Sequence, residues 1–333
     1  MIILNPITLP ASKFLSTMTT LIGDVRNHET IKGGKIVNTL VESCRVYNVD
    51  FGKGIVNNFK VSLQPVKDLT ETSSALTITK PNVAQETILI DNYKFVPISL
   101  SEVLTRDAFL SGEAVNGYLA FVNSIVDETI KSHFYEICLS LYNNWEPAQT
   151  TQVVEIDQID TSTLTGADLR ATQEWNASEI AKVMRKTLNN MQVYNSNFTD
   201  IVNYTDANTG EQGKVVSCLD SDNTKIVFND NYYTNFLADA MASLYHSDVL
   251  GEMLPGDNFA LIPTSKISSD NELTIAWVSD KMKFAIADFY SIALAILDPS
   301  TMYRNSFTHF SYGAGVFKYM PGVKFIANVI QAS

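Results

Sequence analysis

The side chains of this sequence that could carry out chemistry do not fall into the spacings that such chemistry needs. Zinc sites bring histidines and cysteines together at short intervals. No such interval occurs among the four histidines and three cysteines, which are His28, His133, His246, His309, Cys44, Cys138 and Cys218. No serine occupies the G-x-S-x-G pattern of a nucleophile elbow. We therefore expect no catalytic residue, no metal and no cofactor.

Three weaker patterns each have a plainer interpretation. Gly210–Lys214 (GEQGK) resembles half of a phosphate-binding loop, but it lacks the four-residue spacing and the Ser or Thr that follows the lysine. Asp206–Gly210 (DANTG) begins like a calcium loop without an acidic residue at its end, so a turn is expected, with a structural cation as the alternative. Two aspartate pairs could act as acid and base, although loop charges of this kind are usually solvated: Asp157 with Asp160, and Asp220 with Asp222. An unrecognised hydrolase is therefore kept as a distant alternative.

The composition allows a large core and argues against nucleic-acid binding. The chain has 333 residues and is 45% apolar, which predicts two subdomains. It carries 24 basic and 36 acidic residues, a net charge of −12, which is the wrong sign for a protein that grips phosphates. Lys182, Arg185 and Lys186 share one segment, and a solvated helix face is the expected reading.

The termini and cysteines indicate an intracellular origin without a membrane segment. The N-terminus MIILNPITLP lacks a basic region and contains two prolines, so it predicts an extended arm and not a signal peptide. The longest apolar run, Phe284–Leu297, includes Asp288 and is too short to span a bilayer. Three widely separated cysteines argue against a disulfide framework.

The most informative stretch runs from Ile55 to Leu141 and begins with a long predicted hairpin. Phe59, Val61 and Leu63 alternate with polar neighbours, as in a strand with one buried face. Residues 67–74 (KDLTETSS) are polar and predict the tip of the hairpin, and residues 87–98 predict the returning strand. Such a hairpin cannot bury both faces on its own short domain, so a neighbouring surface must cover it.

A long amphipathic helix follows the hairpin. The Ser99–Glu102 segment (SLSE) fits a capping box at the start of a short helix that ends near Ser111. Gly112–Asn143 then predicts one helix of roughly 45 Å. Its expected inner stripe consists of Val115, Tyr118, Val122, Ile125, Ile130, Phe134, Ile137 and Leu141.

The remaining chain predicts a mixed domain of shorter elements. Expected strands lie at 41–51, 153–159, 215–219, 225–228, 259–262, 273–278 and 323–329. Expected helices lie at 178–191 and after the N-cap pair Asn229–Asp230, and residues 203–213 predict a polar loop. Phe284–Leu297 fits both a strand and a helix.

Two stretches carry a resemblance to a known family. Glu86–Ile98 (ETILIDNYKFVPI), followed by the long helix, resembles the return strand and spine helix of the major capsid proteins of tailed bacteriophages, which share the Hong Kong 97 fold. Thr308–Phe317 (THFSYGAGVF) and Pro321–Asn328 (PGVKFIAN) resemble the closing strands of several such proteins. The resemblance spans nearly the whole chain and is one of architecture.

The resemblance implies an α+β fold of the Hong Kong 97 type, with Phe284–Leu297 as a strand. It implies four regions: an N-terminal arm at 1–35, an extended hairpin loop with its base at 36–98, a peripheral domain at 99–160 with about 284–312, and an axial domain at 161–283 with about 313–330.

The same resemblance implies a non-enzymatic shell protein that assembles into hexamers and pentamers of an icosahedral head and encloses double-stranded DNA without sequence-specific binding. Because the chain starts at Met1 without a long helical pro-segment, a separate scaffolding protein is expected, together with a portal; assembly is expected in the host cytoplasm and the product in the virion, without a membrane. An encapsulin-type nanocompartment shell is the near alternative. Expected contact residues between subunits are Phe14, Leu15, Leu21, Phe59, Val61, Leu63, Lys67, Tyr93 and Phe95.

Overall fold

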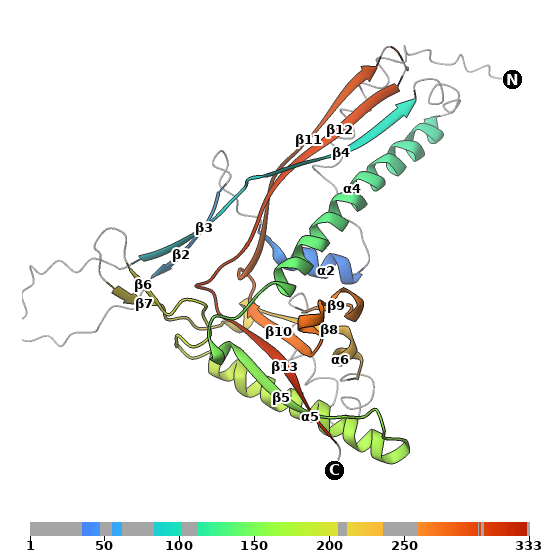
Figure 1. The fold of residues 1–333 in the computed structure, drawn as a ribbon. Coiled ribbons are helices and arrows are strands. Elements are labelled where there is room, and N and C mark those ends of the chain that lie inside the picture. The colour runs from blue at the N-terminus through green and yellow to red at the C-terminus, as the bar shows by residue number, and fades with distance from the viewer. Residues whose placement is uncertain are drawn as a thin grey trace, which may run out of the picture.

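Two larger β-sheets and two long helices form the main part of the described structure. The computed structural model describes residues 35–46, 55–61, 83–101, 112–205, 212–235, 259–298, 300 and 303–331. Figure 1 shows a long sheet that runs beside helix α4 (Gly112–Asn143) and a second sheet that lies on helix α5 (Gly166–Met191). None of the described helices combines the length and the apolar character needed to cross a membrane.

The long sheet has four strands in the order β1-β11-β12-β4. They are β1 (Arg45–Val46), β11 (Phe284–Asp298), β12 (Tyr303–Val316) and β4 (Asn92–Ser101). β11 and β12 form an antiparallel hairpin that is paired along its whole length, with an irregularity between Asp288 and Tyr290. β1 is parallel to β11 and covers only two of its residues, so most of β11 forms one edge of this sheet.

Helix α4 packs on one face of the long sheet through large apolar side chains. Val126, Ile130, Phe134 and Cys138 recur every four residues and are buried. The Phe134 ring meets the edge of Phe310 on β12, with 5.9 Å between ring centroids. The predicted bounds of this helix are confirmed, but Ile125 of the predicted stripe is 41% exposed. Val126 is buried in its place, because it lies four residues before Ile130, just as Ile130 lies four residues before Phe134.

The second sheet has five strands in the order β5-β13-β10-β8-β9. They are β5 (Val153–Ile159), β13 (Gly322–Ile330), β10 (Thr274–Asp280), β8 (Thr224–Asn229) and β9 (Phe259–Ile262). Alternate residues face opposite sides, so Val227 and Trp277 join the core with α4, whereas Ile226 and Val278 join the core with α5. The two hydrophobic cores therefore lie on opposite faces of this sheet, and each face supplies side chains to one of them.

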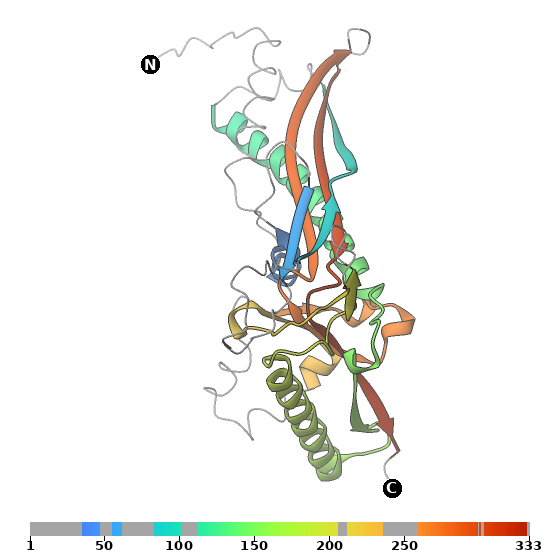
Figure 2. The same cartoon turned by 90° about the vertical axis from the view of Figure 1, so that its left-hand side faces the viewer.

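Helix α5 covers the outer side of the five-stranded sheet, as Figure 2 shows from the side. Ile180, Met184 and Met191 are buried against the sheet, as their helical spacing predicts. The helix begins at Gly166, earlier than the expected start at residue 178. The prediction missed its first turns because they are mostly exposed and carry no apolar period. Lys182, Arg185 and Lys186 are exposed on this helix.

Short elements connect these layers. Helix α2 (Lys35–Cys44) precedes β1 and packs against α4 and β9. Strands β2 (Ile55–Val61) and β3 (Val83–Leu89) form a two-stranded antiparallel ribbon, and β6 (Asn203–Thr205) pairs with β7 (Gln212–Lys214). The rest are α6 (Asp230–Asn235), η1 (Thr150–Gln152), η2 (Ser221–Asn223), η5 (Thr264–Lys266) and η6 (Ser269–Asn271).

Several local predictions are wrong because pairing with distant segments overrides the local pattern. Residues 41–44 of the predicted strand at 41–51 belong to helix α2. The serines of the predicted capping box, Ser99 and Ser101, belong to β4, where Ser99 pairs with Asn305 of β12. Part of the predicted polar loop at 203–213 forms the β6–β7 pair. The expected strand at 215–219 contributes only an isolated bridge at Ser217.

Candidate functional site

The outer half of the long sheet exposes one apolar face. Directly opposed residues in a sheet point to the same side, and the register aligns three rows: Ile292–His309–Phe95, Leu294–Phe307–Pro97 and Ile296–Asn305–Ser99. We call this surface, together with Tyr93, the open face. Among its members Phe95, Ile292, Leu294 and Ile296 are each at least 50% exposed.

The open face is the side of the sheet away from helix α4. The alternating residues on the other side, such as Val96, Thr308 and Phe310, are buried under that helix. In Figure 2, α4 lies on one side of these strands, and no described element covers the outer half of the other side. On the open face itself, the ring of Phe95 contacts Phe307 at 5.7 Å between centroids and His309 at 5.5 Å. The rings therefore form a preassembled apolar surface.

The ribbon of β2 and β3 leaves the long sheet where β3 passes over β12. Ile88 of β3 is buried against Ala285, Ala287 and Phe317. A Cβ atom at Gly313 would lie 2.3 Å from the backbone oxygen of Leu89, so glycine is required at this crossing. The glycines of the SYGAGV segment of β12 thus leave the space that lets the ribbon cross the sheet closely.

A carboxylate midway along β3 ties the ribbon to the turn after β12. Glu86 of β3 accepts hydrogen bonds from the backbone N–H groups of Lys318 (2.9 Å) and Tyr319 (3.0 Å) in the turn after β12. Hydrogen bonds to a charged acceptor are stronger than neutral ones, so this anchor sets the direction in which the ribbon leaves.

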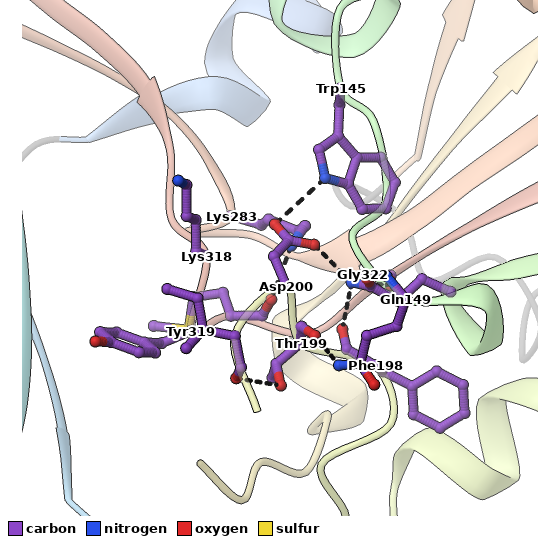
Figure 3. A network of polar contacts seen from close by, with 12 residues as sticks. Trp145, Gln149, Phe198, Thr199, Asp200, Lys283, Lys318, Tyr319 and Gly322 are labelled. Carbon is purple, nitrogen blue, oxygen red and sulfur yellow. Dashed lines mark hydrogen bonds and ion pairs between the residues drawn. The ribbon is translucent and has the colours of Figure 1, made fainter. Parts of the chain in front are cut away.

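A buried ion pair lies next to this anchor, where both sheets and the exit of α4 meet (Figure 3). The Lys283 ammonium donates to Asp200 Oδ2 at 3.0 Å and to the Met320 carbonyl at 2.9 Å, and its side chain is fully buried. Nζ also lies 4.9 Å from the ring centroid of Trp145. Burial lowers the pKa of Lys283, and the neighbouring Asp200 carboxylate opposes that effect.

The remaining contacts of Asp200 complete a satisfied network. Gln152 Nε2 donates to Asp200 Oδ1 at 2.7 Å, and Trp145 Nε1 donates to Oδ2 at 3.4 Å. A Cβ at Gly322 would lie 2.5 Å from the Lys283 side chain, so glycine leaves the space that the lysine occupies. The Lys283 ammonium and the Asp200 carboxylate both contact partners within the protein, and both side chains are buried. The arrangement therefore suits bracing of the fold and leaves no group aimed at a substrate.

Of the two acidic pairs considered from the sequence, Asp157 and Asp160 are held by different partners, in strand β5 and in the turn after it, whereas Asp220 and Asp222 lie together at η2. Asp157 Oδ1 accepts a hydrogen bond from Asn328 at 2.8 Å. Asp160 Oδ1 accepts one from the Ser162 N–H at 2.8 Å, which lowers the pKa of Asp160. Within the described ranges, no three His, Cys, Asp or Glu side chains converge as they would around a metal ion. The calcium-like segment Asp206–Gly210 lies outside the described residues.

The structure places only part of the predicted contact set. Tyr93 and Phe95 are exposed, but they lie on β4 of the long sheet and not on the hairpin, because the predicted return strand divides into β3 and β4 around Ile90 and Asp91. Phe59 and Val61 lie on β2, paired with Gln85 and Val83. The other predicted contacts lie outside the described residues: Phe14, Leu15, Leu21, Leu63 and Lys67. Sequence reasoning missed Ile292, Leu294 and Ile296 as surface residues, although their alternation was visible.

Comparison with known proteins then identifies the family. The family model of the Phi29-like phage major capsid protein matches residues 56–326, which is most of the chain. The chain belongs to this family. It is a phage major capsid protein, a structural component of the virion head, and the expectation drawn from the resemblance is confirmed.

Solved structures show that the capsid protein has the expected Hong Kong 97 type of fold. The capsid structure of Staphylococcus phage Andhra matches with a TM-score of 0.61 at 9% identity, over 91% of this chain and 87% of that chain. The capsid structure of Cyanophage P-SCSP1u matches with a TM-score of 0.53 at 11% identity, over 91% of this chain and 92% of that one. No curated protein matches the sequence. The strand assignment of Phe284–Leu297 is likewise confirmed, as β11.

Proposed function

We propose that copies of this capsid protein associate through the open face and form the pentamers and hexamers of an icosahedral head. The observation that carries the proposal is the row of exposed Ile292, Leu294 and Ile296 beside Phe95. Contiguous exposed apolar surfaces of this kind mark sites that a partner covers. Subunits of a closed shell repeat the same heterologous contact around each ring, and permanent contacts typically bury about 2,000 Å² or more.

The neighbouring subunit's ribbon and arm are the proposed cover for this face. The ribbon leaves the long sheet at a glycine crossing and is fixed by Glu86, so its direction is set by its own subunit. Phe59, Val61, Leu63 and Lys67 would make the ribbon contacts, and Phe14, Leu15 and Leu21 the arm contacts. The regions proposed for these roles are an arm at 1–35, a hairpin loop at 36–98, a peripheral domain at 99–160 with about 284–312, and an axial domain at 161–283 with about 313–330.

The assembled head would enclose double-stranded DNA without reading its sequence. The net charge of −12 supports this, because a container that repels DNA weakly, with screening over about 8 Å, can pack and release it. We further propose that assembly takes place in the host cytoplasm and uses a separate scaffolding protein and a portal.

Association of the purified chain tests the proposal. Leu294→Asn and Ile296→Asn place amides on the open face without touching the core under α4. We expect the unchanged chain to form rings or shells by analytical ultracentrifugation and negative-stain electron microscopy, and the variants to stay monomeric. Ile125→Gln is the matched control, since Ile125 is an exposed apolar residue on α4. Equal loss of assembly in the control, or normal particles from both face variants, would contradict the assigned surface.

A further inference from the structure

An ionisable side chain, His309 of β12, lies in the middle of the open face. It occupies the row Ile292–His309–Phe95 and is partly exposed. The centroid of its ring lies 5.5 Å from that of Phe95 and 6.5 Å from that of Phe307. Within the part of the chain that the structure describes, its ring nitrogens have no hydrogen-bond partner. The one side chain of this row that can carry a charge is therefore flanked by aromatic rings.

None of the described elements places an opposite charge beside His309. The two neighbouring rows of the open face hold neither a carboxylate nor a cation; they are Tyr290–Ser311–Tyr93 and Leu294–Phe307–Pro97.

The charged groups nearest along the strands lie farther away or on the other side. On the open face, Asp91 is four positions before Phe95 and Asp298 is six positions after Ile292, which corresponds to about 14 Å and about 20 Å along a strand. The remaining groups lie on the side of α4: Asp288, which pairs with Arg45, Lys94, which is opposite Phe310, and His133 of α4 itself. An imidazolium at His309 thus has no close negative partner within the described structure.

We propose that His309 makes the association of subunits through the open face dependent on pH, with the neutral imidazole as the form that a neighbour covers. The inference rests on the proposed function, because it concerns the same contact. The cover proposed there offers apolar groups and one cation but no carboxylate; it consists of Phe59, Val61, Leu63 and Lys67 of the ribbon and Phe14, Leu15 and Leu21 of the arm. A charge that is buried without a partner is costly, whereas an uncovered imidazolium stays hydrated. Protonation of His309 therefore favours the separated subunits.

Proton linkage gives the sign and the size of the effect. The separated subunits bind a proton that the covered contact releases, so association weakens as the pH falls through the range in which imidazoles titrate, roughly pH 8 to 5. For an ordinary imidazole, with a pKa of about 6.5, the association constant of one contact falls by up to about tenfold between pH 7.5 and pH 5.5. Each subunit of a ring offers one open face. The threshold concentration for assembly should therefore rise by up to the same factor.

The overall charge of the chain predicts the opposite direction. The net charge is −12 with neutral histidines, and it would change to −8 if all four histidines gained a proton. Weaker repulsion between like-charged subunits favours their association at the lower pH. The two effects differ in sign, so a higher threshold concentration at pH 5.5 indicates a proton that is released when the contact forms.

Threshold concentrations for assembly of the full chain at pH 7.5 and pH 5.5, at one ionic strength, test the proposal. Light scattering against protein concentration measures the threshold, and circular dichroism at both pH values checks the fold. The ratio of the two thresholds is taken within each chain, so an effect of a substitution at neutral pH cancels. The unchanged chain should have a severalfold higher threshold at pH 5.5, and His309→Phe should lose that rise. An undiminished rise in His309→Phe, or a lower threshold at pH 5.5 in the unchanged chain, would overturn the proposal.

Two further variants separate the open face from the rest of the molecule. His133→Gln removes an imidazole on the side of α4, where His133 Nε2 lies 3.0 Å from the Tyr312 hydroxyl, and this variant should keep the rise at pH 5.5. Phe307→His in the His309→Phe background places an imidazole in the next row of the open face and should restore the rise. Loss of the rise in the folded His133→Gln chain, or no restoration by Phe307→His, would overturn the proposal.

Failure of the inference and failure of the proposed function give different results. Equal thresholds at the two pH values, with normal particles by negative-stain electron microscopy, would overturn the role of His309 alone. Absence of particles from the unchanged chain at both pH values would contradict the proposed function and this inference with it.

Discussion

The buried pair of Lys283 and Asp200 gives the sharpest stability prediction. Its atoms are 3.0 Å apart, and at an effective dielectric constant of about 20 two charges at that distance attract by about 5 kcal/mol. Removing one partner leaves the other charge buried alone, which typically costs about 3–5 kcal/mol. We expect Asp200→Asn and Lys283→Met each to lower the free energy of unfolding by that amount. The double variant should lose clearly less than the sum, because neither uncompensated charge remains.

Urea unfolding at pH 7 in the Leu294→Asn background, which is expected to stay monomeric, measures these differences by tryptophan fluorescence, and Trp145 lies beside the pair. Lys266→Met is the matched control: the Lys266–Glu136 pair is equally short at 2.9 Å, but both side chains are about half exposed, and such pairs contribute about 0–1 kcal/mol. If the two buried-site variants added without coupling, or cost no more than the control, burial would not be what makes this ion pair important.

Four further outcomes follow from the structure. Gly313→Ala should lower the unfolding midpoint by several degrees in calorimetry, because its Cβ would lie 2.3 Å from the Leu89 oxygen; an unchanged midpoint would contradict the close crossing. Glu86→Gln should cost about 1–2 kcal/mol in urea unfolding, since two hydrogen bonds lose their charged acceptor. Deleting residues 67–74 should leave a folded monomer by circular dichroism that forms no shells in electron microscopy, and normal particles would refute the assembly role of the hairpin tip. Cys44→Ser should destabilise more at pH 8.5 than at pH 6: the thiol pKa is about 6 when folded and 9.0 in its ordinary state, so the unfolded chain binds more protons between these values and stability rises with pH there.

The sequence was sufficient to predict elements whose local pattern and final environment agree. The bounds of α4 are those predicted, and β9 and β5 coincide with their expected strands. In each case the apolar period matches the face that is buried. The period of Phe284–Leu297 was ambiguous because β11 is apolar on both of its faces. The family resemblance supplied the strand assignment there.

Local pattern failed where a distant segment decides the conformation. Residues 41–51 were expected to form a strand, but residues 41–44 belong to helix α2, which packs against α4 and β9. The serines at Ser99 and Ser101 fit a helix cap, yet ten residues of β12 pair with this segment and extend it as β4. Neither partner could be identified from the neighbouring residues. The Lys283–Asp200 pair was missed for the same reason, since its members are 83 positions apart.

The location of the open face follows from how many layers cover the long sheet. A sheet flanked by helices on both sides buries two apolar faces, and one with a single helix can bury only one. β11 nevertheless carries apolar residues on both sides, and in the described structure α4 covers only the side that includes the buried residues of β12 and β4. The apolar row of Ile292, Leu294 and Ile296 is thus in excess of what the monomer needs for its own core. The proposed contact with another subunit would cover this row, which is why we propose the assembly surface on the strands and not on the helices.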